Sequence, residues 1–190
     1  MRVLFITHPE VEIDPAKDVR RWRLSERGVD RMRTFVASDA VANVGEVWAS
    51  AETKAVEAAE LLAARNSLPV HVDADLGEND RSATGFVPPD EFEKLAVAFF
   101  ANPDQSVRGW ETARSAQARI RRTVTRLVGA RGAVGDLAIV AHGGVGTLLL
   151  CDLLGVPISR DRDQPAQGHF WSFDPATLQV IHGWTPIAPP

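Results

Sequence analysis

Short apolar segments alternate with longer segments of helical pattern along this chain, and this alternation constrains its fold more than any other feature. Val3–Ile6 and Leu137–Val140 are short aliphatic runs between polar residues, as is typical of strands buried in a parallel sheet. Further short strands are predicted at Glu46–Ala49 and Pro69–Val72. Strands that alternate with helices form sheets covered on both faces, so we predict an α/β fold: a three-layer α/β/α sandwich with a mostly parallel central sheet.

The predicted helices lie between these strands. Ser25 can accept a hydrogen bond at the start of a helix in which apolar residues recur at helical spacing. Four more segments have helical composition or helix start signals: 52–64, 88–102, 112–128 and 145–154. Two alternating segments around Pro175 predict an antiparallel hairpin at the sheet edge. This edge could pair in a dimer or equally be covered by the proline-rich segment Pro186–Pro190, so the oligomeric state stays open.

No internal repeat or low-complexity linker divides the 190 residues, so we predict one domain spanning residues 1–190. The stretch Asp73–Pro89 is rich in polar residues, glycine and proline, and it predicts a long loop. Loops of that length in compact domains more often serve function than merely connect elements.

Composition narrows the class of protein. The chain is 45% hydrophobic with a formal net charge of −4, which is typical of a globular protein and argues against nucleic acid or an anionic membrane as its partner. Its single cysteine, Cys151, cannot form an intramolecular disulfide or a cysteine-rich metal site, and suits a reducing compartment. The apolar run at the N-terminus is too short for a signal peptide, and Asp152 interrupts the longest later run. We therefore predict a cytoplasmic protein.

Two of the predicted strands lead directly into a histidine. His8 follows the first strand after Thr7, and His142 follows the Leu137–Val140 strand after Ala141. Ligands of open parallel sheets bind beyond the carboxyl ends of the strands, so neighbouring strands would point both imidazoles into one crevice. From this pattern alone, a shared site and two separate structural histidines remain equally open.

Three other segments carry candidate ligand-binding groups. Gly143 and Gly144 would let backbone N–H groups approach an anion at a helix start, although a tight turn without ligand explains them too. Ser50 and Lys54 offer a hydroxyl and an ammonium group where a strand leads into a helix, although Lys54 could equally be an ordinary surface lysine.

The predicted loop contributes the third segment. Glu78 and Asp80 are candidate proton donors, and Arg81 is a candidate anion clamp. The alternative is a solvated polar loop with no chemical role.

These motifs, in this order, resemble those of the histidine phosphatase superfamily, also called phosphoglycerate-mutase-like. The similarity extends over nearly the whole chain and implies the fold predicted above. The segments that match the family's motifs are Thr7-His8-Pro9, Leu24–Gly28, Ala49–Ala59, Leu76-Gly77-Glu78, Gly109–Thr112 followed by Arg119, and Ala141–Gly144.

The resemblance implies a metal-independent phosphomonoesterase that needs no cofactor and acts on a small phosphorylated substrate. His8 would attack phosphorus and become phosphorylated, since neutral imidazole is a good nucleophile. His142 would stabilise the phosphoryl group, and Glu78 would protonate the leaving oxygen. The phosphate-binding residues would be Ser50, Lys54, Arg81 and Gly143.

Three departures from the family pattern bear on this function. Thr7 stands where the family has an arginine, Lys54 replaces a second arginine, and Pro9 replaces a glycine whose N–H could face phosphate. Lysine lacks the planar, bidentate fork with which arginine binds phosphate. Two hypotheses follow: a phosphatase, or a catalytically weakened member that serves as an anion- or protein-binding module.

A phosphatase would need another cation in place of the missing arginine. Arg81 is the favoured candidate because it lies three residues after Glu78, and Arg160, Arg162 and His169 are alternatives. A mutase is less favoured than either hypothesis. Mutases of this family are longer and carry an insertion, whereas the resemblance implies only a small cap here, at about residues 77–108.

Overall fold

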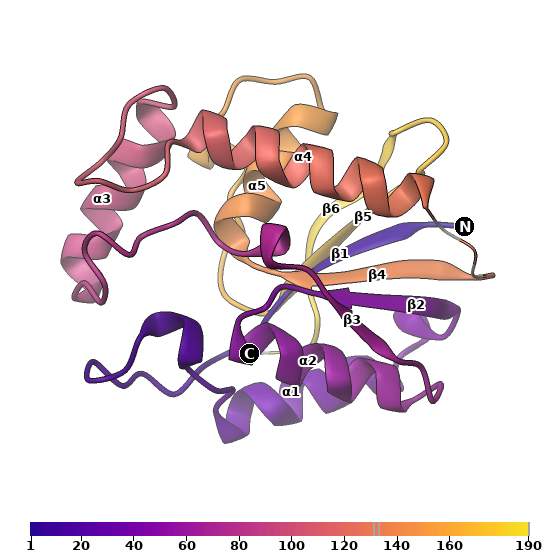
Figure 1. Cartoon of the computed structure of the whole chain (residues 1–190). Helices are drawn as coiled ribbons and strands as arrows, with labels where there is room; N and C mark the ends of the chain where they lie inside the picture. Colours follow the sequence, from indigo (N-terminus) through magenta and orange to yellow (C-terminus); the bar gives the residue numbers. More distant parts are fainter. Residues whose placement is uncertain (131, 133, 190) are drawn as a thin grey trace.

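The computed structural model describes residues 1–130, 132 and 134–189. Its strands are β1 (Val3–Thr7), β2 (Val44–Ala49), β3 (Val70–Val72), β4 (Asp136–Ala141), β5 (His169–Phe173) and β6 (Val180–Pro186). They form one sheet in the order β3-β2-β4-β1-β5-β6 (Figure 1). The first four strands in this order are parallel, whereas β5 is antiparallel to both of its neighbours, β1 and β6, which confirms the mostly parallel sheet and the hairpin at its edge.

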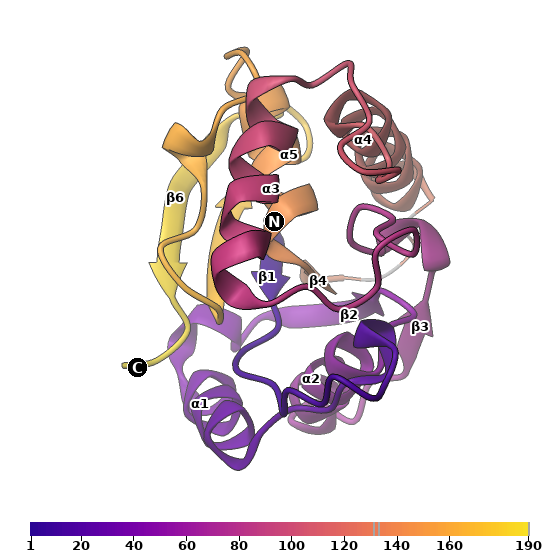
Figure 2. The same cartoon turned by 90° about the vertical axis from the view of Figure 1, so that its left-hand side faces the viewer.

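Helices cover both faces of this sheet. The helices are α1 (Glu26–Ala37), α2 (Thr53–Ala64), α3 (Pro89–Ala101), α4 (Ala113–Gly129) and α5 (Gly143–Leu153). One face carries α1 and α2 and the other carries α4 and α5, so the predicted three-layer α/β/α arrangement is confirmed (Figures 1 and 2). Helix α5 begins two residues earlier than predicted, because both glycines after His142 adopt helical geometry. In the described part of the chain, no helix is both long and apolar enough to span a membrane.

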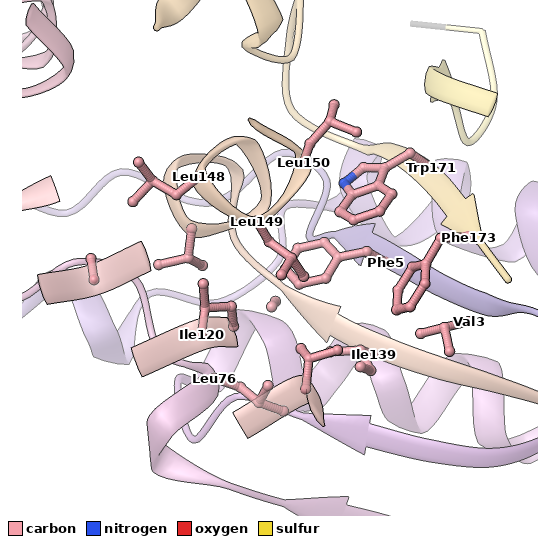
Figure 3. Packing of buried hydrophobic residues seen from close by; sticks show 14 of the residues in the cluster. Val3, Phe5, Leu76, Ile120, Ile139, Leu148, Leu149, Leu150, Trp171 and Phe173 are labelled. Atoms are coloured by element: carbon pink, nitrogen blue, oxygen red, sulfur yellow. The ribbon is translucent and has the colours of Figure 1, made fainter. Parts of the chain in front are cut away.

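The β1 side chains alternate between the two halves of the core. Val3 and Phe5 point toward α4 and α5, whereas Leu4 and Ile6 point toward α1 and α2. All four are fully buried, which explains why β1 is continuously apolar in sequence. Figure 3 shows Phe5 beside Trp171, and these rings stack with centroids 5.5 Å apart. Burial of each such side chain contributes about 1.5–3 kcal/mol.

On the opposite face, small side chains bring α2 close to the sheet. Ala55, Ala58 and Ala59 are fully buried and pack in the same cluster as Leu4 and Ile6. Because an alanine adds only one methyl group, the helix axis can approach the strands closely. The start of α2 is therefore held next to the carboxyl ends of β2 and β4.

Helix α3 lies beyond the end of the sheet where β1 and β4 terminate (Figure 2). Its Phe99 and Phe100 are buried, as is Trp110 in the segment before α4. These aromatic residues belong to the same buried cluster as Val3 and Phe5. The predicted cap region is thus continuous with the core on the α4–α5 side.

We expect Thr112→Ala to lower the free energy of unfolding by about 1 kcal/mol, because Thr112 caps the start of α4. Its hydroxyl oxygen accepts a hydrogen bond from the Ser115 N–H at 3.1 Å. Urea unfolding measures the change. Thr125→Ala, on the exposed face of the same helix, is the matched control and should be neutral or slightly stabilising. Equal destabilisation by both substitutions would contradict the capping role.

Candidate active site

The pairing of β1 with β4 brings the two strand-end histidines together. Thr7 lies opposite Ala141 in the parallel register, so His8 and His142 are the next residues on neighbouring strands. The His8 N–H donates a hydrogen bond to the Ala141 carbonyl at 3.2 Å. The two imidazole rings meet edge to face with centroids 5.3 Å apart. The condition that sequence alone left open, that these strands are neighbours, is therefore met.

The surroundings of His8 fix both its charge and its tautomer. Its Nδ1 lies 2.8 Å from the Pro9 carbonyl oxygen, and a carbonyl can only accept, so Nδ1 carries the hydrogen. The lone pair consequently lies on Nε2. Burial, aided by the nearby Lys54 charge, lowers the pKa of His8 to about 4. A neutral imidazole with a free Nε2 lone pair is the form of histidine that acts as a nucleophile.

His142 lies deeper, with 1% of its surface exposed. Its Nε2 is 2.7 Å from the Ser50 Oγ, and this oxygen accepts the Glu52 N–H at 3.2 Å. The same Nε2 lies 3.3 Å from the Glu52 carboxylate. Burial lowers the pKa of His142 well below its ordinary value, although the Glu52 charge opposes this. Both histidines of the site are thus held neutral at pH 7.

Sequence reasoning missed Glu52, a buried carboxylate at the start of α2. Its Oε2 accepts a hydrogen bond from the Lys54 ammonium at 2.5 Å, and Lys54 also donates to the Val19 carbonyl at 2.8 Å. Burial alone raises the pKa of Glu52, but the ion pair with Lys54 and the hydrogen bond from the Glu78 N–H lower it. Lys54 is therefore not a surface lysine. The only signal in the sequence was an acidic residue two positions before Lys54.

Glu78 occupies the N-terminus of α5. Its two carboxylate oxygens accept the Gly144 and Val145 N–H groups, each at 3.0 Å. A Cβ on Gly144 would lie 2.6 Å from the Glu78 Oε1, so glycine is required for this approach. The glycine motif thus holds a carboxylate of the protein itself. Asp80, the other candidate proton donor, is exposed, and its Oδ1 accepts the Ser82 N–H at 2.8 Å.

The loop that carries Glu78 is fixed by Arg119 of α4. The guanidinium pairs with Glu111 at 2.7 Å and donates to the carbonyls of Asp75, Gly77 and Glu78. These bonds use donors on both terminal nitrogens. Arg119 thus supports the site from behind, as part of the loop's structure.

Arg81 lies on aromatic rings instead of pairing with a carboxylate. Its guanidinium lies over the rings of Phe92 and Trp110, at 5.0 and 5.7 Å from their centroids. Throughout the described residues it has no hydrogen-bond acceptor or ion-pair partner. Its charge contributes to lowering the pKa of both His8 and His142, after larger effects of burial and Lys54.

The alternative cations have other partners or are exposed. Arg160 pairs with Glu93 and, at 3.3 Å, with Asp163. Arg162 is exposed, and its carbonyl accepts the Trp184 indole N–H.

Over residues 1–130, 132 and 134–189, no three His, Cys, Asp or Glu side chains cluster as a metal site would require.

Thr7, the residue directly before His8, forms hydrogen bonds only with uncharged groups. Its Oγ1 accepts the His169 N–H at 3.0 Å and lies 2.7 Å from the Gln164 Oε1. Sequence reasoning missed Gln164, because it lies in an irregular loop without a recognisable motif. His169 thus contacts the site through its backbone.

The family model of the histidine phosphatase superfamily (branch 1) matches residues 5–172. A comparison with curated proteins gave no match.

Several solved structures have the same fold. A mycobacterial glucosyl-3-phosphoglycerate phosphatase with inorganic phosphate superposes with a TM-score of 0.81 at 18% identity, covering 98% of each chain. The alpha-ribazole phosphatase of Shigella flexneri gives a TM-score of 0.74 at 20% identity, over 99% of this chain and 98% of that one. YhfR of Bacillus stearothermophilus gives 0.74 at 21% identity, over 95% of each chain.

Burial of a neutral His8 predicts a pH dependence of stability. The folded-state pKa of His8, about 4, lies below the ordinary 6.5, so between these pH values His8 is protonated in the unfolded chain but neutral in the folded one. The stability that depends on this difference is fully present above pH 6.5 and is lost as the pH falls toward 4. Removing this group in His8→Asn should lower the slope of unfolding free energy against pH, near pH 5, by about 1 kcal/mol per pH unit.

Urea unfolding between pH 4 and 7 measures this slope. His71→Asn removes an imidazole from the exposed strand β3 and gives the reference for losing a histidine outside the site. An unchanged slope in His8→Asn would show that His8 is not held neutral by folding.

Proposed function

Because the chain belongs to the histidine phosphatase superfamily, we propose that it hydrolyses phosphomonoesters without a metal, through a phosphohistidine at His8. One observation carries the proposal: His8 is neutral and its Nδ1–H is bonded to Pro9, which leaves the Nε2 lone pair for attack. Two structures with this fold carry phosphatase names, which supports the reaction class. A small phosphorylated substrate is the proposed partner.

In the first step, the His8 Nε2 attacks phosphorus and the bond from phosphorus to the ester oxygen breaks. That oxygen takes a proton from Glu78 and leaves as an alcohol. In the second step, water attacks the phosphohistidine, its proton passes to Glu78, and the N–P bond breaks. The sum is one ester and one water consumed, and one alcohol and one inorganic phosphate formed.

The phosphoryl oxygens would be bound by donors that the protein leaves unused. Lys54 has three N–H bonds and donates two to protein acceptors, so one remains. The Gly143 N–H has no acceptor in the described structure, and neither has the Arg81 guanidinium. Ser50 and His142 would complete the set, since their side chains already share a hydrogen bond next to His8.

Glu78 must leave α5 to serve as the acid. Its carboxylate accepts the Gly144 and Val145 N–H groups, which are the donors an incoming phosphoryl oxygen would also take. Substrate binding would therefore displace Glu78 toward the leaving oxygen.

The charges of the site favour a second hypothesis, an anion- or protein-binding module with weakened chemistry. Lys54 is paired with Glu52 and both histidines are neutral, which leaves the Arg81 guanidinium as the unpaired positive charge among the proposed phosphate-binding residues. A phosphate dianion would therefore meet little excess positive charge. Binding of phosphate without turnover would be the expected behaviour of such a module.

We expect the purified protein, with a chelator present, to release inorganic phosphate from at least one member of a phosphomonoester panel. His8→Ala should abolish release because it removes the imidazole that attacks phosphorus. Arg81→Met should lower kcat/KM by about 100- to 1000-fold, the range for loss of one charge-stabilising donor. Arg122→Met, on the exposed face of α4, is the matched control and should retain full activity.

Three results would count against the phosphatase. Equal activity in His8→Ala would exclude the phosphohistidine, and loss of activity with the chelator would exclude a metal-independent reaction. Phosphate binding without release from any ester would select the binding module.

A further inference from the structure

Gln164 is a side chain that the mechanism above does not use, and it touches both histidine segments. Its Oε1 lies 2.7 Å from the hydroxyl of Thr7, the residue before His8. Its amide nitrogen packs against Gly143, the residue after His142: a Cβ on Gly143 would lie 2.2 Å from this nitrogen and 2.8 Å from the amide carbon. Only a glycine leaves room for the amide at the first residue of α5.

The Thr7 hydroxyl sets the orientation of this amide. Thr7 is 1% exposed, and its Oγ1 already accepts the His169 N–H, so its own hydrogen is free to donate. The nearest acceptor is the Gln164 Oε1, at 2.7 Å against 3.1 Å for the His169 carbonyl. The amide oxygen is thereby bound to Thr7, and the two N–H bonds of Gln164 point away from it.

The backbone of Gln164 is fixed independently of its side chain. Its N–H donates to the Asp163 Oδ1 at 2.8 Å, and the same oxygen accepts the Thr147 hydroxyl of α5 at 3.0 Å. Four residues further on, the Gly168 N–H donates to the carbonyl of His8 at 3.1 Å. The loop is thus attached both to α5 and to the proposed nucleophile.

The amide nitrogen has no acceptor anywhere in the described residues, yet it is packed at the start of α5. We propose that Gln164 is a phosphate-binding residue whose amide donates to a phosphoryl oxygen, and that Thr7 is the positioning residue that orients it. This inference rests on the proposed phosphate site. A neutral Thr7–Gln164 pair then supplies the hydrogen bond that the family pattern assigns to the arginine before the nucleophile.

Titration calorimetry with inorganic phosphate, on the full chain and without metal, tests the inference. Gln164→Leu removes the donor and should weaken phosphate binding by about 10- to 100-fold, the range for a hydrogen bond to a charged group. Gln164→Glu, of equal shape, should weaken it further by adding a negative charge. Gln167→Leu, an exposed glutamine of the same loop, should leave the affinity unchanged.

Thr7 is tested by the coupling of two substitutions. Thr7→Val should weaken phosphate binding, whereas Thr7→Ser should bind phosphate as the wild type does, because only the hydroxyl orients the amide. In the Gln164→Leu background, Thr7→Val should have little further effect, whereas a merely structural role would add its full effect. Urea unfolding of each variant separates loss of binding from loss of folding.

The outcomes distinguish this inference from the proposed function. Wild-type affinity in Gln164→Leu overturns the role of Gln164 even if the protein hydrolyses esters. Weakened binding in Gln164→Leu, with no hydrolysis by the wild type, supports Gln164 and rejects the phosphatase. A wild type that binds no phosphate overturns the inference.

Discussion

The buried carboxylate of Glu52 is the contact on which the arrangement of the site depends. Its two oxygens join three segments: the start of α2 through Lys54, the cap loop through the Glu78 N–H, and the end of β4 through His142. A buried carboxylate without partners would be costly, so these contacts must form together. Because Lys54 also bonds the Val19 carbonyl, the loop before α1 is attached to the same group.

This internal pairing sets a balance between nucleophilicity and anion affinity. Burial keeps His8 and His142 neutral, which gives His8 a free lone pair but removes two positive charges from the phosphoryl site. Glu52 neutralises Lys54, which removes a third. What remains for an anion is the set of unused donors: one N–H of Lys54, the Gly143 amide and the Arg81 guanidinium on its aromatic support. The site is thus arranged to bind through directed hydrogen bonds more than through net charge.

Much of this arrangement follows from local patterns in the sequence. The apolar run of β1 and the helix start at Ser25 are decided by neighbours along the chain, and the structure has both where they were predicted. Glu52 and Gln164 could not be found in this way, since their roles come from contacts with residues far apart in the sequence. Neither lies in a pattern whose period or spacing marks it. The predicted start of α5 lies two residues after the observed one, because glycines after a strand suggest a turn. Glu78, which is far from these glycines in the sequence, stabilises their helical conformation.

The departures from the family pattern around His8 are linked by the geometry. Thr7 is 1% exposed, so an arginine there would need both space and an anionic partner. The space next to the start of α5 is taken by Gln164, and the nearest groups bonded to Thr7 are a backbone N–H and a neutral amide. Restoring arginine at position 7 alone would therefore bury a charge among neutral partners, which is costly. A charged donor at this position would require changes at position 164 as well, so the two positions act as one unit of the site.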